Sequence, residues 1–192
     1  MTAGEVLGVF KETGALLEGH FLLSSGLHSA QYLQCALVLQ DPKIAERLCG
    51  ALSKKFKNEK PNIVVAPAIG GIIVSYGVAQ SLGVKGLFTE RVDGKMSLRR
   101  GFSISSRDKV LVVEDVVTTG KSTKEVLELI KSLGGEVIGV GCIADRSQGK
   151  ADFGVELKSL IKIDIPTFNS SECPLCKAKT PLVKPGSRLI KA

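Results

Sequence analysis

The sequence of 192 residues holds 26 basic and 19 acidic residues, a net charge of +7 near neutral pH. Hydrophobic residues make up 44% and charged residues 23%, which is typical of a globular domain with a real core and excludes a disordered chain. Aromatic residues make up only 5%, which disfavours a nucleic-acid-binding face. The positive charge suits either an ordinary solubilising surface or an enzyme with polyanionic substrates. No membrane-length apolar run and no secretory signal pattern is found, so we expect a cytoplasmic protein.

The first 40 residues predict a helix followed by two short strands. The helix should span residues 2–13, with Thr2 as its cap and Glu5 completing a capping box. Residues 19–39 contain β-type apolar runs that are interrupted by Ser-Ser-Gly, which indicates two strands and a turn.

A second helix is predicted to begin at Asp41-Pro42, where a capping residue precedes a proline at the first helical position. Its apolar residues recur every fourth position and should face the core. They are Ile44, Leu48, Leu52 and Phe56.

From residue 62 onward, short apolar strands alternate with helices. The strands are predicted at residues 63–66, 84–90, 109–115, 136–146 and 159–165. A helix from Lys121 to about Leu133 should turn Val126, Leu129, Ile130 and Leu133 toward the core. This alternation predicts an α/β fold with a central parallel sheet flanked by helices. In such sheets ligands bind at the carboxyl ends of the strands.

Residues 110–123 combine a buried strand, two acids, a loop and a helix start: Val-Leu-Val-Val-Glu-Asp-Val-Val-Thr-Thr-Gly-Lys-Ser-Thr. Backbone N–H groups at this helix N-terminus can hold a phosphate, and nearby hydroxyls can add donors. Glu114 and Asp115 repel phosphate but can accept hydrogen bonds from sugar hydroxyls. The segment therefore predicts a ribose 5-phosphate site. A capped helix after a core strand is the alternative, and Asp115 stands where an ATP-binding P-loop needs glycine.

A second loop, residues 66–72 (Ala-Pro-Ala-Ile-Gly-Gly-Ile), also follows an apolar strand and opens a helix. Gly70 and Gly71 would let the backbone approach a ligand closely. Taken alone, this loop would be an ordinary strand-to-helix turn.

Residues 110–120 resemble the motif that binds phosphoribosyl pyrophosphate (PRPP) in type I phosphoribosyltransferases: four apolar residues, two acids, two apolar residues and Thr-Thr-Gly. In the same family, the pyrophosphate loop is similar to residues 66–72. The resemblance implies a parallel-sheet core with a small N-terminal hood. It implies PRPP contacts from Ala68, Gly70, Gly71, Arg91, Lys95, Glu114, Asp115, Val116, Val117, Thr118, Thr119, Gly120, Lys121 and Ser122.

Three further segments resemble orotate phosphoribosyltransferases. Residues 19–32 are similar to the orotate-binding hood, residues 89–102 to the mobile catalytic loop, and Arg146 ends the fourth core strand where the family binds the orotate carboxylate. The family transfers the 5-phosphoribosyl group from PRPP to orotate in pyrimidine biosynthesis, with Mg²⁺, as a homodimer with shared active sites. The resemblance implies that Lys95, Glu114 and Asp115 are catalytic, and that Thr118 and Arg146 bind orotate.

The resemblance also divides the chain into residues 1–40 (helix and hood), 41–166 (PRPP-binding core) and 167–192 (tail). Many members carry lysine where this chain has Ser24 and Gly70, and a histidine in the mobile loop, where this chain has none. Alternatives are a purine-type phosphoribosyltransferase, which the hood disfavours, and a PRPP-sensing regulator of nucleic acid. Outside this pattern, Arg146 would be a surface ion pair. His20 and His28 belong to the hood pattern and are expected to be structural or hydrogen-bonded turn residues, not acid–base catalysts.

Five cysteines form no secreted disulfide pattern. Cys35, Cys49 and Cys142 lie in apolar stretches and are expected to be buried. Cys173 and Cys176 form a C-x-x-C, which is half of a zinc ribbon, but there is no second C-x-x-C and neither histidine is near in sequence. The favoured interpretation is a structural turn with free thiols or a local disulfide and no bound zinc. Zinc shared between subunits comes next, and redox catalysis last.

Overall fold

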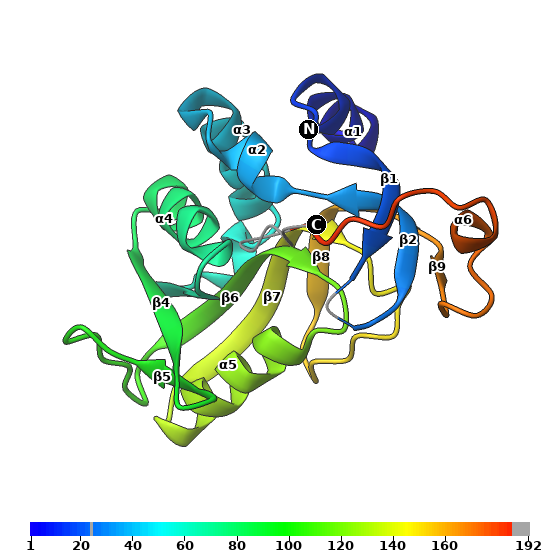
Figure 1. Ribbon diagram of the computed structural model, residues 1–192. Coiled ribbons are helices and arrows are strands. Elements are labelled where there is room, and N and C mark those ends of the chain that lie inside the picture. The colour runs from blue at the N-terminus through cyan, green and yellow to red at the C-terminus, as the bar shows by residue number, and fades with distance from the viewer. Residues whose placement is uncertain (24, 186–192) are drawn as a thin grey trace.

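A six-stranded sheet in the order β5-β4-β3-β6-β7-β8 forms the centre of the computed structural model, which describes residues 1–23 and 25–185 (Figure 1). Its strands pair in parallel except at the edge, where β5 runs antiparallel to β4. The strands are β3 (Ile63–Pro67), β4 (Lys85–Val92), β5 (Lys95–Leu98), β6 (Lys109–Val117), β7 (Glu136–Asp145) and β8 (Leu157–Lys162). The predicted α/β fold with a central parallel sheet is confirmed.

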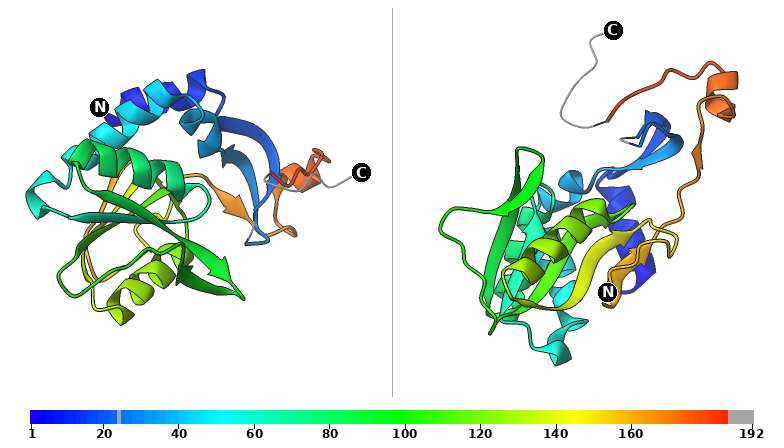
Figure 2. Two further views of the ribbon diagram at one scale, coloured as in Figure 1. Left: turned by 90° about the vertical axis from the view of Figure 1, so that its left-hand side faces the viewer. Right: turned by 90° about the horizontal axis from the view of Figure 1, so that it is seen from below.

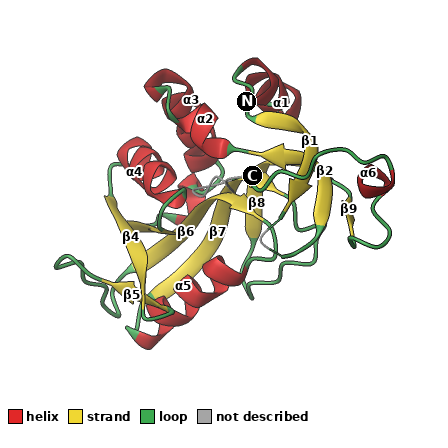
Figure 3. Cartoon of the chain, viewed as in Figure 1, coloured by secondary structure: helices red, strands yellow, loops and turns green. Residues whose placement is uncertain are grey.

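Helices cover both faces of this sheet (Figure 3). Alternate strand residues point to opposite faces. Val64 and Leu111 belong to one core cluster, whereas Val65 and Val112 belong to the other. The first cluster is covered by α1 (Ala3–Glu12), α2 (Cys35–Leu39), α3 (Pro42–Lys54) and α4 (Gly71–Leu82), and the second by α5 (Lys121–Ser132). A 3₁₀ turn, η1 (Lys57–Glu59), follows α3.

The hood is a separate three-stranded sheet in the order β1-β2-β9. It consists of β1 (Leu16–Leu22), β2 (His28–Leu33) and β9 (Thr167–Phe168), and the tail with its short helix α6 (Pro174–Lys177) lies against it (Figure 2). Val183 of the tail forms a parallel bridge with Phe21 of β1. The predicted boundaries at residues 40 and 166 stay a prediction, but in space β9 and the tail join the N-terminal hairpin.

The expected helix starts are confirmed. Thr2 and Glu5 form a capping box at α1, and the Asp41 carboxylate caps α3 by accepting the N–H groups of Lys43 and Ile44. The expected core face of α3 is also present, with Leu48, Leu52 and Phe56 buried and Ile44 partly buried.

Three expectations are wrong. Residues 35–39 form a helix and not a strand, because the apolar run packs into the core beside α3. Leu133 was expected to face the core, but it caps the end of α5 and is 40% exposed. Leu127, which was not expected on the core face, is buried. The segment 91–101 is not only a loop, because Asp93-Gly94 makes a two-residue turn between β4 and β5. Ser24 and residues 186–192 lie outside the described residues.

Within the described chain, we find no helix with both the length and the apolar character needed to span a membrane.

Candidate active site at the carboxyl edge of the sheet

The loop between β6 and α5 presents a helix N-terminus at the carboxyl edge of the sheet. Val117 ends the buried strand, and Thr118 and Thr119 are exposed. Gly120 caps α5 with a φ of 73°, a left-handed conformation that favours glycine. A Cβ atom there would also lie 2.8 Å from the ring of Phe153. The first N–H groups of α5 have no partner within the helix, so they can bind an anion.

Two carboxyl groups lie directly before this loop. Glu114 is 9% exposed and Asp115 is partly buried, although acidic side chains are seldom buried without a partner. Burial, and next the charge of Asp115, raises the pKa of Glu114 well above its usual value near 4.5. Burial also raises the pKa of Asp115, although the N–H of Val116 donates to its carboxylate at 2.9 Å. Neither forms an ion pair within the described residues.

The glycines of the β3–α4 loop lie against these two carboxyl groups. A Cβ atom on Gly70 would come within 2.5 Å of an Asp115 carboxyl oxygen, and one on Gly71 within 3.2 Å of a Glu114 oxygen and 2.8 Å of the Ala66 side chain. A side chain at Gly70 would therefore have to push the Asp115 carboxyl group aside, and one at Gly71 would collide with the side chain of Ala66. The two loops that the sequence predicted separately therefore form one site, because β3 and β6 are neighbours in the sheet.

Arg146 follows β7 at the same edge. Its backbone N–H donates to the carbonyl of Val117 at 2.8 Å, which joins it to the loop before α5. The Nε atom is buried and has no hydrogen-bond partner among the described residues. Burial lowers the pKa of the guanidinium, and the neighbouring Tyr32 and Cys35 partly offset this. A buried donor without an acceptor costs stability, so a ligand acceptor would be bound favourably here.

The hood contributes Tyr32 to this edge. Tyr32 lies on β2 and is partly buried. Burial raises the pKa of its hydroxyl, repulsion by Asp115 raises it further, and Arg146 opposes both. Tyr32 therefore lies near the acid and the cation. The sequence placed Tyr32 in the hood segment but did not predict it as a site residue. No local signal shows which hood side chains face the core.

The predicted mobile segment projects from the sheet as a hairpin. The Arg91 guanidinium donates to the carbonyl of Gly94 at 2.8 Å and to Glu125 of α5 at 2.5 Å. Arg100 pairs with Glu90 at 2.7 Å and lies over the ring of Phe88. Lys95 is exposed and forms no ion pair within the described part of the chain. Asp93-Gly94 between two strand-like runs was the sequence signal for this hairpin.

Comparison with known proteins identifies the family. A model of the phosphoribosyl transferase domain matches residues 37–174. The chain is 55% identical over 190 residues to an orotate phosphoribosyltransferase of Desulforamulus reducens, covering 99% of this chain and 100% of that protein. The chain belongs to the orotate phosphoribosyltransferases. A relative of the same name from Caldanaerobacter subterraneus is 57% identical over 188 residues, which cover 98% and 99% of the two chains.

The fold agrees with this family too. The crystal structure of an orotate phosphoribosyltransferase from Aeropyrum pernix superposes with a TM-score of 0.70 at 26% identity, and the match covers 82% of this chain and 93% of the other. The predicted family and fold are therefore confirmed. The structure brings Glu114, Asp115, Gly70, Gly71 and the loop before α5 together. It pairs Arg91 with α5 and leaves Lys95 at the surface.

Proposed function

We propose that this orotate phosphoribosyltransferase transfers the 5-phosphoribosyl group from PRPP to orotate at the carboxyl edge of β3, β6 and β7. The products would be orotidine 5'-monophosphate and pyrophosphate, in the biosynthesis of pyrimidine nucleotides. The observation that carries the proposal is the buried pair Glu114 and Asp115, which lies between the glycines of one loop and the helix N-terminus that follows the other.

The 5-phosphate of PRPP would bind the loop before α5. The N–H groups of residues 117–122 and the hydroxyls of Thr118, Thr119 and Ser122 would donate to its oxygens, with Lys121 adding positive charge at the helix start. The ribose hydroxyls would then donate to Glu114 and Asp115. Hydrogen bonds to the ionised carboxylates would lower the pKa values that burial raises. The pyrophosphate would lie along Ala68, Gly70 and Gly71, where the absence of side chains lets backbone donors approach.

Orotate would bind between the hood and Arg146. Its carboxylate would accept a charge-assisted hydrogen bond from the guanidinium, whose buried Nε lacks an acceptor among the described residues. Tyr32 lies close enough to Arg146 to influence its pKa and could add a donor. Thr118, at the exposed end of β6, would contact the acceptor base from the other side.

The residues present fit Mg²⁺ that arrives with PRPP. Glu114 and Asp115 would offer the ion carboxylate oxygens, and they carry no compensating ion pair within the described chain. Two carboxylates are too few for a complete cage, which suits an ion that keeps waters and binds substrate phosphates. When bound, the ion would neutralise charge on the pyrophosphate.

Catalysis would depend on positioning and charge. Breaking the C1–O bond leaves an oxocarbenium-like sugar and adds negative charge to pyrophosphate, so donors arranged in advance lower the barrier. Lys95 and Arg91 would neutralise the leaving group when the hairpin moves over the site. Arg91 would first have to exchange its contact with Glu125 for the substrate. Closure of residues 91–101 would also exclude the water that hydrolyses PRPP.

The enzyme is proposed to be a cytoplasmic homodimer with shared active sites. Ile69 of the loop at residues 66–72 is 85% exposed, and Ile73 and Tyr76 of α4 are 44% and 69% exposed. An apolar surface beside the site is typical of an interface between subunits. Five free cysteines suit a reducing compartment. Sedimentation equilibrium would test the dimer, and a mass of one chain at assay concentration would contradict it.

The activity is tested by the ultraviolet absorbance of orotate mixed with PRPP, Mg²⁺ and the protein. We expect orotate to be consumed only when all three are present, with pyrophosphate released in equal amount. Reactions that contain adenine, guanine or xanthine in place of orotate are the controls. Consumption of a purine while orotate stays unchanged would contradict the proposal.

A further inference from the structure

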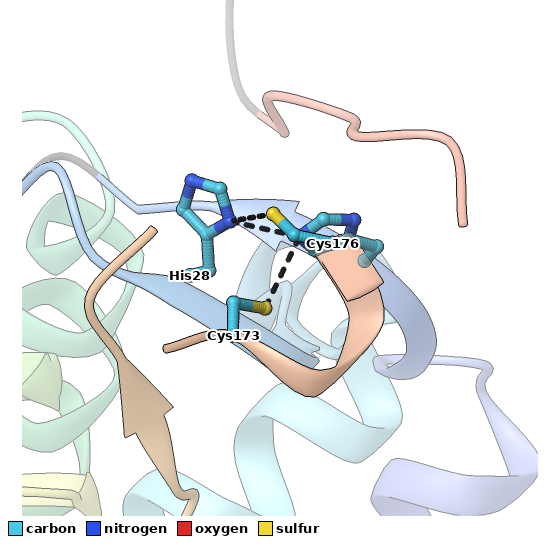
Figure 4. Close-up of side chains that lie close together, drawn as sticks. His28, Cys173 and Cys176 are labelled. Atoms are coloured by element: carbon cyan, nitrogen blue, oxygen red, sulfur yellow. Dashed lines mark hydrogen bonds between the residues drawn. The ribbon is translucent and has the colours of Figure 1, made fainter. Parts of the chain in front are cut away.

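Four potential metal ligands meet where the hood contacts the tail. His20 lies on β1 and His28 on the neighbouring strand β2. Cys173 caps the start of α6 and Cys176 lies within it, and Figure 4 shows both cysteines beside His28. The four ligand atoms all lie within 4.8 Å of one another. His20, His28 and Cys173 are 2%, 5% and 0% exposed, and Cys176 is the exposed member. Neither histidine is near the cysteines in sequence, but the tail returns to the hood and brings all four residues together in space.

The distances fit a tetrahedral ion. With zinc–nitrogen bonds of about 2.0–2.1 Å and zinc–sulfur bonds of about 2.3 Å, a tetrahedron places nitrogen and sulfur about 3.5 Å apart. The Sγ atom of Cys173 lies 3.5 Å from Nε2 of His20, and that of Cys176 lies 3.7 Å from the same nitrogen and 3.3 Å from Nδ1 of His28. The two histidine nitrogens are 2.8 Å apart and would have to separate by about half an ångström.

A hydrogen bond outside the cluster orients His20 for this role. Its Nδ1 lies 2.8 Å from the carbonyl oxygen of Thr180. A carbonyl oxygen only accepts, so Nδ1 must carry the proton. In the neutral ring, Nε2 then carries no proton, and its lone pair faces the two sulfur atoms. Histidine ligands commonly donate their other ring N–H to a carbonyl in this way, which fixes the ring and its tautomer.

We propose that His20, His28, Cys173 and Cys176 of one chain bind a structural Zn²⁺ ion. Two thiolates and two imidazoles in a tetrahedral arrangement match the Cys₂His₂ class, and thiolate ligands disfavour Mg²⁺ and Ca²⁺. Four protein ligands leave no position open for substrate, so the ion stabilises structure and takes no part in phosphoribosyl transfer.

The ion would tie the tail to the hood. Apart from the cluster and the His20–Thr180 contact, the described part of the tail forms two backbone hydrogen bonds with β1, from Leu22 to Val183 and from Val183 to His20, each 2.8 Å long. Strand β9 adds only two residue pairs with β2. Such small contacts open easily. Because β2 also carries Tyr32, a metal that fixes the hood would steady the wall facing Arg146.

Metal analysis of protein that carries no affinity tag and was grown with added zinc tests the proposal. We expect about one zinc per chain after gel filtration. The Cys173→Ser, Cys176→Ser double variant should lose it, whereas Cys49→Ala, which removes a thiol buried elsewhere in α3, should keep it. Half a zinc per chain would replace the proposal with an ion shared between subunits. Zinc retained by the double variant, or no zinc in the wild type, would overturn it.

A second measurement begins with the folded wild type, whose Co²⁺ spectrum does not depend on the folding of any variant. Protein stripped by a chelator should bind Co²⁺ with the visible absorption of a tetrahedral site and a thiolate charge-transfer band. Mutations of residues outside the ligand shell typically weaken metal binding by about 10–100-fold. His28→Ala removes a ligand, so it should weaken Co²⁺ binding by more than that. An unchanged affinity would exclude the histidines. A disulfide between Cys173 and Cys176 in protein purified under reducing conditions would also contradict the proposal.

Hydrogen exchange locates the effect. Removing zinc should speed exchange in residues 16–33 and 167–185 and leave the strands of the core unchanged. Uniform exchange with and without metal would contradict a role in tying the tail to the hood. None of these measurements uses transferase activity, so their outcome is independent of the proposed function.

Discussion

The two halves of β6 have different roles. Val110, Leu111, Val112 and Val113 are 0% exposed and contribute alternately to the two core clusters. The next two residues, Glu114 and Asp115, are carboxyl groups whose pKa values burial raises. Burying apolar surface stabilises the fold, whereas burying an unpaired acid costs stability. A single strand therefore holds the sheet together along most of its length and accepts a local cost at its carboxyl end, where substrate binding is proposed.

The largest effect should come from the apolar half. Leu111→Ala leaves a cavity between β6 and the helices of the first cluster, so the free energy of unfolding should fall by about 2–5 kcal/mol. Denaturant titration measures this loss. At temperatures where the variant is folded, KM for both substrates should stay near the wild-type value. A stable variant with altered KM would break the division between the two halves.

Arg146→Ala should act on binding instead. Loss of a charge-assisted hydrogen bond to the orotate carboxylate is worth about 1.5–3 kcal/mol, or roughly 10–150-fold in KM for orotate. KM for PRPP should change far less. The melting temperature should not fall, because the variant removes a buried donor that has no partner within the described chain. Equal increases in the two KM values would remove Arg146 from the orotate site.

Asp115→Asn tests the acidic end of β6, which is expected to serve the reaction more than the stability of the fold. The amide keeps the shape but loses the charge that would accept a ribose hydroxyl, so kcat/KM should fall by roughly tenfold or more, about 1.4 kcal/mol. The melting temperature should change little, because the charge lost is one that burial already disfavours. Steady-state kinetics with varied PRPP measures the effect. A fully active variant would show that Asp115 lies outside the reaction.

The smallest effect should be the pH dependence of Glu114→Gln. Because the folded pKa of Glu114 lies above its usual value near 4.5, the folded state holds a proton that the unfolded state has lost. The contribution of Glu114 to the free energy of unfolding therefore falls as the pH rises from about 4.5 toward the folded pKa. A glutamine side chain cannot ionise, so the variant should gain stability relative to the wild type as pH rises over that range. Denaturant titration at a series of pH values measures the difference, and a difference independent of pH would contradict a buried ionisable Glu114.

Helix caps and strands were predictable because they depend on residues that are close in sequence. The capping box at Thr2 and the Asp41 cap follow from spacing within a few residues, and both are confirmed. The five core strands lie near their predicted positions, whereas residues 35–39 form a helix where a strand was expected. Leu133 was misplaced because periodicity gives a helix face but not where the helix ends. The hairpin at residues 91–101 was missed although Asp93-Gly94 signalled it, because the family resemblance outweighed the turn.

The sequence by itself determined the parallel sheet and the strand, loop and helix start of residues 110–123, because these depend on the pattern of consecutive residues. Only the tertiary structure decided which distant residues meet. Gly70 and Gly71 reach Asp115 and Glu114 because β3 and β6 pair. His20 reaches Cys173 across 153 positions because the tail returns to the hood. Such contacts depend on the path of the whole chain, and no local periodicity records them.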